Sequence, residues 1–311
     1  MRTAELPGGV TVRTFSTPPD GFDPVQADDR ALLAYGYPSR PEDPELLERW
    51  ERVLSGPIRF IEPAFGSMPS RRRRLPTART RSVHDHAVQD TIWSGAVVHP
   101  GDGDSFKWIE GEWTVPNAYL PAGALKGRWY FASTWIGIDG FYGPDVLQAG
   151  CDSSVMRTSA GAIQRQLSPW WEWYPADTIS ITNLPIAQGD TLDGLICMDA
   201  GSVTSAMIFL LNVTSGVAAR FGATAPPGTS LAGNSAEWVV ERLEEITHPH
   251  MPELARYGDV YFDAANTGTM ANKLLNAGAG SVINMVDSDE TISTGRIETP
   301  TLVQVRYTSP K

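Results

Sequence analysis

Cysteine is scarce in this chain of 311 residues, which contains only Cys151 and Cys197. Two cysteines exclude a disulfide-rich scaffold, and we expect two free thiols packed as small hydrophobic side chains. Long apolar runs are also absent, because no stretch approaches the roughly 20 apolar residues that a bilayer-spanning helix needs. We therefore predict a soluble protein with no membrane partner.

The N-terminal 24 residues contain no apolar run of the roughly 7–15 residues that forms the centre of a signal peptide. Pro7, Gly8 and Gly9 interrupt the segment early. The default expectation from these residues is a cytoplasmic protein.

Lysine is also rare, and the chain contains only Lys107, Lys126, Lys273 and Lys311. Residues 1–88 carry 13 basic and 12 acidic side chains, whereas residues 89–311 carry 12 and 24. The excess of negative charge in residues 89–311 disfavours binding to nucleic acid, which is itself negatively charged. Its self-repulsion falls as carboxylates protonate, so an acidic working pH is tolerable.

The first 88 residues contain the only clear helix signals. Residues 43–56 combine Asp43 as an N-cap, Pro44 at the first helical position, apolar residues at three- and four-residue spacing, and Gly56 as a stop. A weaker helix is predicted from residue 28 to residue 35. Both are too short to fold alone, so their apolar faces must dock on something larger.

Residues 66–88 lack apolar periodicity and are rich in arginine, proline and small polar residues. We interpret this segment as a solvated linker. Its basic run, residues 71–74, has two further interpretations, namely a nucleic-acid contact and a site for proteolytic cleavage.

After residue 89 the sequence becomes a series of short segments rich in β-branched and aromatic residues, separated by Gly, Pro, Asn and Asp. This pattern predicts an all-β protein, an antiparallel sandwich or barrel. The segments are 94–99, 111–116, 128–138, 145–150, 170–175, 178–186, 191–200, 206–214, 236–243, 259–265, 281–287 and 302–308. We predict an N-terminal extension over residues 1–88 and a β-sandwich domain over residues 89–311.

Gln148 stands in the otherwise apolar segment "DVLQAGCD". Strand alternation places Gln148, Gly150 and Asp152 on one face. An unpaired buried amide costs on the order of 1–3 kcal/mol, so Gln148 either has protein partners or faces a cavity where a ligand binds. We expect the cavity.

Two further segments carry acids within apolar surroundings. In "PWWEWYP", alternation puts Trp170, Glu172 and Tyr174 on one side, and because this segment is hard to bury on both faces we expect them at a groove floor. The alternative is a solvent-facing carboxylate between partly exposed aromatic rings. In "SAEWVVE", Glu237 precedes an apolar strand, and the spacing alone favours a simple edge residue.

Six segments occur in the order and approximate spacing of one known family: "WSGAVV" (93–98), "GEWTVP" (111–116), "STWIGIDG" (133–140), "VLQAGCD" (146–152), "WWEWYP" (170–175) and "SAEWVVE" (235–241). Over residues 92–311 the chain resembles the glutamic peptidases, the eqolisin family. The resemblance implies a concanavalin A-like sandwich of antiparallel sheets and an acid endopeptidase acting on polypeptides. We expect the protein to be a monomer that uses neither a metal nor a cofactor.

The resemblance also implies site residues. The catalytic pair corresponds to Gln148 and Glu237. The family's groove residues correspond to Trp135, Asp139, Asp152 and Glu172. Trp170 and Tyr174, which alternation places beside Glu172, are expected to bind substrate or support the pair with them.

The sequence departs from the family in three respects. Ile92 replaces the usual asparagine before Trp-Ser-Gly, the family's disulfide pattern is missing, and no signal peptide is recognisable, although the resemblance implies secretion. Residues 1–88 are then either a propeptide that covers the groove, cleaved at residues 71–74, or helices that dock permanently. The apolar helix stripes favour permanent docking.

Three competing functions remain. A metal enzyme would use His84, His86, His248 and His250, whose spacing does not match known zinc sites. A glycosidase would use Glu172 and Glu237 as its two carboxylates but would leave Gln148 without a role. A noncatalytic, lectin-like sandwich would bind glycans or peptides in an aromatic groove.

Overall fold

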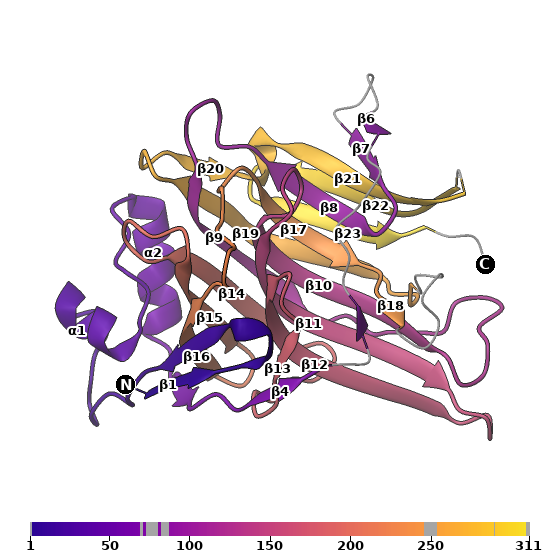
Figure 1. The fold of residues 1–311 in the computed structure, drawn as a ribbon, viewed down its shortest axis with the longest axis horizontal. Coiled ribbons are helices and arrows are strands. Elements are labelled where there is room, and N and C mark those ends of the chain that lie inside the picture. The colour runs from indigo at the N-terminus through magenta and orange to yellow at the C-terminus, as the bar shows by residue number, and fades with distance from the viewer. Residues whose placement is uncertain are drawn as a thin grey trace.

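The computed structural model of the protein describes residues 2–68, 71–72, 80–81, 87–245, 254–288 and 290–308. Figure 1 shows a sandwich of long antiparallel strands with two helices on one side. His84, His86, His248, His250 and half of the basic run at residues 71–74 lie outside the described residues. The all-β prediction is confirmed.

The strands form one hydrogen-bonded series that folds over into two layers. The first layer contains, in order, β13 (Ile179–Ile181), β12 (Ile163–Tyr174), β11 (Val146–Arg157), β10 (Trp129–Asp139), β17 (Ala236–Glu241), β8 (Trp93–Val98) and β21 (Ser281–Asp287), with β7 (Ala87–Asp90) and β6 (Thr80–Arg81) beside β21. The second layer contains β22 (Glu290–Thr299), β23 (Leu302–Tyr307), β19 (Asp259–Thr269), β9 (Phe106–Thr114), β14 (Thr191–Met198), β15 (Ser205–Asn212) and β16 (Val217–Thr224). Smaller elements are β20 (Leu274–Asn276), which pairs with β19, the pair β5 (Arg71–Arg72) and β18 (Glu244–Glu245), and the 3-10 turns η1 (Pro7–Gly9) and η2 (Ala277–Ala279).

The main hydrophobic core lies between the layers and is built by strand alternation. Leu147, Ala149 and Cys151 of β11 point into it, as do Trp171 and Trp173 of β12. The residues between them, Gln148 and Glu172 among them, therefore lie on the outer face of the first layer. The candidate site residues occupy this outer face.

One prediction about "PWWEWYP" is wrong. We expected this segment to resist burial on both faces, yet Trp170, Trp171 and Trp173 are fully buried and Glu172 is 2% exposed. Trp171 and Trp173 fill the main core, whereas Trp170 belongs to a second apolar cluster on the outer face. Both faces of β12 are covered, so Glu172 is not the solvent-facing carboxylate of the alternative interpretation.

Both predicted helices are confirmed. In α1 (Asp29–Tyr35) the Asp28 side chain caps the first turn and Gly36 ends the helix with a left-handed φ of 70°. In α2 (Pro44–Leu54) the Asp43 carboxylate accepts from the backbone N–H groups of two residues in the first turn. These caps satisfy backbone donors that would otherwise lack partners.

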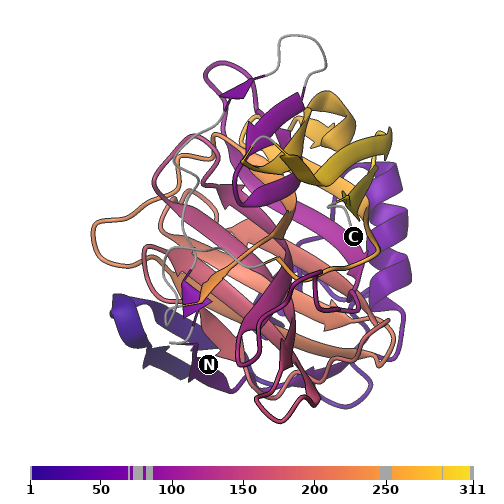
Figure 2. The same cartoon turned by 90° about the vertical axis from the view of Figure 1, so that its right-hand side faces the viewer.

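The helices dock on the outer face of the second layer, on the opposite side of the sandwich from the candidate site (Figures 1 and 2). Trp50 and Leu54 of α2 pack with Phe209 and Leu211 of β15 in a separate apolar cluster. Burial of these side chains supplies the stabilisation that two such short helices cannot supply by themselves.

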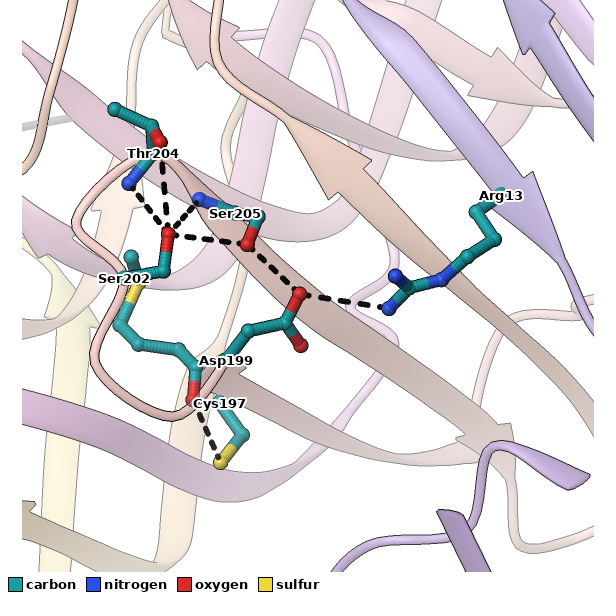
Figure 3. Close-up of polar contacts among 7 residues, drawn as sticks. Arg13, Cys197, Asp199, Ser202, Thr204 and Ser205 are labelled. Carbon is teal, nitrogen blue, oxygen red and sulfur yellow. Dashed lines mark hydrogen bonds and ion pairs between the residues drawn. The ribbon is translucent and has the colours of Figure 1, made fainter. Parts of the chain in front are cut away.

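The rest of the extension pairs with strands of the sandwich. β1 (Arg2–Glu5) and β2 (Thr11–Thr14) form a hairpin, β2 and β3 (Arg59–Ile61) pair with β16, and β4 (Phe65–Ser67) pairs with β13. Figure 3 shows a polar contact of this edge, in which Arg13 of β2 donates to Asp199 Oδ2 (3.4 Å), which also accepts from the Ser205 hydroxyl (2.8 Å). The described parts of the predicted linker thus include short paired strands.

Cys151 and Cys197 are free thiols, as expected, and burial raises the pKa of each to about 11. Within the part of the chain that the structure describes, neither helix has the length and apolar character needed to cross a bilayer.

Candidate active site

The site is organised by β10, which lies between β11 and β17 in the first layer. Gly137 of β10 is directly opposite Gln148 on one neighbour and opposite Glu237 on the other. Glu172 of β12 is opposite Gln148 in the next pair. Residues opposite one another in adjacent strands point to the same face, so Glu172, Gln148 and Glu237 form one transverse row on the outer face.

Glycine at position 137 leaves a gap in the middle of this row. Two strand spacings separate the Cα atoms of Gln148 and Glu237, about 9.5 Å. A side chain at position 137 would lie between them, and a Cβ built there lies 3.3 Å from Gln148 Cβ and 3.0 Å from the Trp135 ring. Gly137 therefore contributes no side chain of its own between the amide and the carboxyl group, and the Trp135 ring is the atom group nearest to that position.

A hydrogen-bonded chain fixes the amide of Gln148. Its Nε2 donates to Glu172 Oε2 (2.5 Å), and Glu172 Oε1 accepts from the Thr178 hydroxyl (2.8 Å). All three side chains are buried, at 2%, 2% and 4% exposure. Gln148 Oε1, at the other end of the amide, is buried without a hydrogen-bond partner among the described residues.

Two further polar contacts join β10 to its neighbours on this face, and Glu241 lies opposite Ser133 in the register of β10 and β17. Trp135, two residues before Gly137, donates from Nε1 to Glu241 Oε2 of β17 (3.0 Å). The Ser133 hydroxyl donates to Asp152 Oδ1 of β11 (2.5 Å). These bonds tie β10 to both neighbours on the side of the sheet that carries Gln148 and Glu237.

Asp139 ends β10 in a left-handed conformation, with φ of 69°. Its carboxylate accepts backbone N–H groups from Gly233 (2.9 Å) and Asn234 (2.7 Å). Burial raises the pKa of Asp139 despite the opposing effect of these N–H donors. The segment that Asp139 holds leads directly into β17, the strand that carries Glu237.

The remaining predicted residues lie at the same face. Trp170 is fully buried in an apolar cluster with Trp135, Val239 and Met68, and Tyr174 ends β12 with partial exposure. Gln148 is 2% exposed and Glu237 is fully buried. We expected these residues to face an open groove, whereas the structure shows this face covered.

Glu237 is also not the edge residue that its spacing alone favoured. Its strand, β17, is paired on both sides, with β10 and with β8. Because β17 is an internal strand, hydrogen bonds to a neighbouring strand on each side fix the backbone of Glu237.

The geometry disfavours the glycosidase interpretation. Glu172 and Glu237 lie in β12 and β17, with β11 and β10 between these two strands. The Gln148 side chain stands between them and is bonded to Glu172. Glycosidases hold their two carboxyl groups about 5–9.5 Å apart with the sugar bond between them.

Two other interpretations depend partly on residues outside the described ranges. Among the described residues no group of three or more His, Cys, Asp or Glu side chains is arranged to hold a metal ion, and the four histidines proposed for one are not among them. Of the basic run, Arg71 and Arg72 pair through their backbone with Glu245 and Glu244.

Sequence reasoning missed three residues of this site: Gly137, Thr178 and Ser133. Gly137 lies inside the "WIGIDG" segment, and its significance depends on which strands flank β10. Thr178 precedes β13 with no local feature that distinguishes it from other threonines. No sequence signal identifies the Ser133 contact with Asp152.

Comparisons with known proteins identify relatives of this chain. The chain is 27% identical over 191 residues to Aspergillopepsin-2 of Aspergillus niger, covering 56% of this chain and 62% of that protein. It is 24% identical over 202 residues to Scytalidopepsin B of Scytalidium lignicola, covering 62% and 70%. The chain therefore spans less than two thirds of the length of Aspergillopepsin-2.

Solved structures show the same fold. A scytalido-glutamic peptidase crystallised with a peptide-based transition state analogue matches with a TM-score of 0.56 at 21% identity, covering 70% of this chain and 98% of that one. Aspergilloglutamic peptidase from Aspergillus niger matches with a TM-score of 0.50 at 24% identity, covering 58% and 99%. The sequence profile of the Peptidase A4 family matches residues 91–307, well over half of the chain, and the protein therefore belongs to that family.

Proposed function

We propose that this protein is an endopeptidase that hydrolyses peptide bonds at acidic pH, with Gln148 and Glu237 as its catalytic pair. Membership of the Peptidase A4 family and the similarity to Aspergillopepsin-2 support the peptidase class. The observation that carries the assignment of the pair is the row in which Gln148 and Glu237 flank Gly137 on one face of the sheet.

Peptide hydrolysis needs a base that activates water, a donor for the oxyanion and an acid for the leaving nitrogen. Glu237, when ionised, takes a proton from a water molecule held in the gap above Gly137. The water oxygen forms a bond to the peptide carbonyl carbon, giving a tetrahedral oxyanion. Protonated Glu237 then passes the proton to the nitrogen as the C–N bond breaks, which regenerates the carboxylate.

Gln148 suits the partner role because its amide offers both a donor and an acceptor and stays neutral in acid. One Nε2 hydrogen is used by Glu172, which leaves the second for the oxyanion. The acceptor Oε1 is available to orient the attacking water. A second carboxylate at this position would instead have to share a proton with Glu237.

The other site residues have supporting roles in this proposal. Asp139 and Asp152 hold the backbone and side chains around the pair through their hydrogen bonds. Trp135, Trp170 and Tyr174 supply apolar surface for substrate side chains. Because Gln148 and Glu237 are at most 2% exposed, a peptide reaches them only after the side chains covering this face move.

The test is cleavage of denatured casein from about pH 2 to about pH 7. Gln148→Ala should lower kcat/KM by about a hundredfold or more, since one oxyanion donor contributes about 3 kcal/mol. Glu237→Gln should lower it by at least as much, because it removes the general base and acid. Gln304→Ala, which removes an amide on β23 of the second layer, is the matched control and should retain activity.

Thermal unfolding of each variant separates loss of chemistry from loss of fold. Undiminished cleavage by folded Gln148→Ala and Glu237→Gln proteins would refute the assigned pair. The noncatalytic lectin-like alternative would be favoured if the wild-type protein bound peptides or glycans but cleaved no peptide anywhere in the tested pH range.

A further inference from the structure

The connection between β12 and β13 brings Thr178 beneath the row of site residues. Thr178 is 4% exposed, and its hydroxyl donates to Glu172 Oε1 at 2.8 Å. The other carboxylate oxygen of Glu172 accepts from Gln148 Nε2. The hydroxyl, the carboxylate and the amide thus form one continuous chain that ends at the catalytic amide.

Glu172 determines which end of the Gln148 amide faces the reaction. An ionised carboxylate can only accept hydrogen bonds, so the NH2 group must face Glu172 and Oε1 must face away from it. A flipped amide would set two acceptors against each other in a buried site. The orientation of the amide therefore depends on where the Glu172 oxygens are held.

The torsion about the last bond of a glutamate side chain is broad and weakly restricted. With Thr178 bonded to one oxygen and Gln148 to the other, the plane of the carboxylate is fixed. Loss of the Thr178 hydroxyl removes one of the contacts that hold this plane, and any rotation of the carboxylate carries the Gln148 amide with it. A small rotation is enough to misdirect the donor intended for an oxyanion.

Thr178 is itself held by the N-terminal extension. Its backbone carbonyl accepts from the N–H of Met68 (3.3 Å), continuing the pairing of Ile179 with Ser67 between β13 and β4. Met68 also packs in the apolar cluster that contains Trp135 and Trp170. Met68, which directly follows β4, therefore contacts the residue that begins the chain to Gln148.

We propose that Thr178 is a positioning residue for Gln148, acts through Glu172, and is held in place by β4 of the N-terminal extension. This inference rests on the proposed peptidase function, because Gln148 needs a fixed orientation only if its amide acts on substrate. It makes the extension a functional support of the site.

The experiment compares Thr178→Val with Thr178→Ser in the full-length protein. Thr178→Val, which removes the hydroxyl, should lower kcat about tenfold, the loss expected for one hydrogen bond, and should change KM by no more than about twofold. Thr178→Ser keeps the hydroxyl, so its kcat should stay within about threefold of the wild-type value. Thr182→Val is the matched control, since its hydroxyl bonds Ala64 of the same edge (3.0 Å) and is not bonded to Glu172. It should leave kcat unchanged.

A second readout does not depend on activity. The Gln148 side-chain NH2 resonances, assigned by their loss in Gln148→Ala, should shift and exchange faster in Thr178→Val but not in Thr182→Val. Unchanged resonances together with unchanged kcat would overturn the proposal. If the wild-type protein cleaves no substrate, the proposed function fails, and the amide resonances alone then test the positioning role of Thr178. If Thr178→Val does not fold, Thr178→Ala takes its place.

Discussion

At the scale of single residues, Gly137 is the position that separates the two residues of the proposed catalytic pair. It is the only position in the row between Gln148 and Glu237, and its neighbours leave little room for a Cβ. The nearest atoms are the Trp135 ring at 3.0 Å and the Leu147 carbonyl oxygen at 3.2 Å. Any side chain here would occupy the space proposed for the attacking water.

We predict that Gly137→Ala lowers kcat at least about tenfold, because the methyl group displaces water from between the pair and shifts Trp135. Gly194→Ala is a matched control, since a Cβ there is equally crowded, 3.0 Å from the Trp113 ring, but lies in the core between the layers. Kinetics and thermal unfolding of both variants separate the effects. Equal loss of activity in the two would mean that general strain, not the gap, is responsible.

At the scale of elements, helix α2 is attached to the second layer by a charged cluster as well as by apolar packing. Arg49 lies within 3.8 Å of Glu110 and 3.7 Å of Glu112 of β9, and bonds Asp193 of β14. Asn266 of β19 donates a hydrogen bond to Glu110, and the negative charge of Asp263 helps to raise the pKa of Arg49. Asp193 and Glu110 also line a cavity of about 440 Å³, together with Lys107 and Lys273. Three acids thus share one guanidinium.

Burial, opposed by Arg49 but reinforced by Glu110 and Glu112, raises the pKa of Asp193 from 3.8 to about 7. Burial also raises the pKa of Glu110. The folded protein therefore holds protons on this cluster at pH values where the unfolded chain has released them. The resulting stabilisation is complete below about pH 4 and is lost as the pH rises to about 7.

We predict that the free energy of unfolding falls between about pH 4 and about pH 7, and that Asp193→Asn makes this dependence shallower because asparagine cannot ionise. Thermal unfolding of both proteins at several pH values measures the difference. Asp20→Asn, at an exposed position, should leave the dependence unchanged. A slope as steep in Asp193→Asn as in the wild type would contradict the prediction.

At the scale of the whole molecule, the N-terminal extension surrounds the sandwich on three sides. Its hairpin and β3 cover the edge at β16, its helices cover the outer face of the second layer, and β4 covers the edge at β13. Phe65 of β4 packs edge-on against Trp171 and Phe221 of the core. Removing the extension would expose two sheet edges and an apolar face.

We propose that residues 2–68 are a permanent part of the folded protein, even if the chain is cut. After cleavage at a specific protease site introduced within residues 71–74, we expect the extension to co-elute with the sandwich in native size-exclusion chromatography. The two parts should separate only in denaturant. Spontaneous dissociation of the extension after cleavage, accompanied by a rise in peptidase activity, would instead support its role as a removable propeptide.

Local residue patterns alone were enough to predict several parts of this protein. Asp43 and Pro44 marked the start of α2, because capping depends only on neighbouring backbone groups. Alternation placed Gln148 with Asp152 on one face of β11, and Glu172 with Trp170 and Tyr174 on one face of β12, as the structure does. Strands without a strong apolar run, such as β16 and β22, were missed because their pairing partners stabilise them.

The sequence by itself determined which side chains share a face of each strand, where the helices begin, and the family to which the chain belongs, since these depend on local spacing and on residue identity. Tertiary structure alone decided that β10 lies between β11 and β17, so that Gln148 and Glu237 meet across Gly137. It also decided the burial of Glu237, the bond from Thr178 to Glu172 and the cluster around Arg49. Strand order and side-chain contacts join residues far apart in the chain, and no local pattern records which distant strand becomes a neighbour.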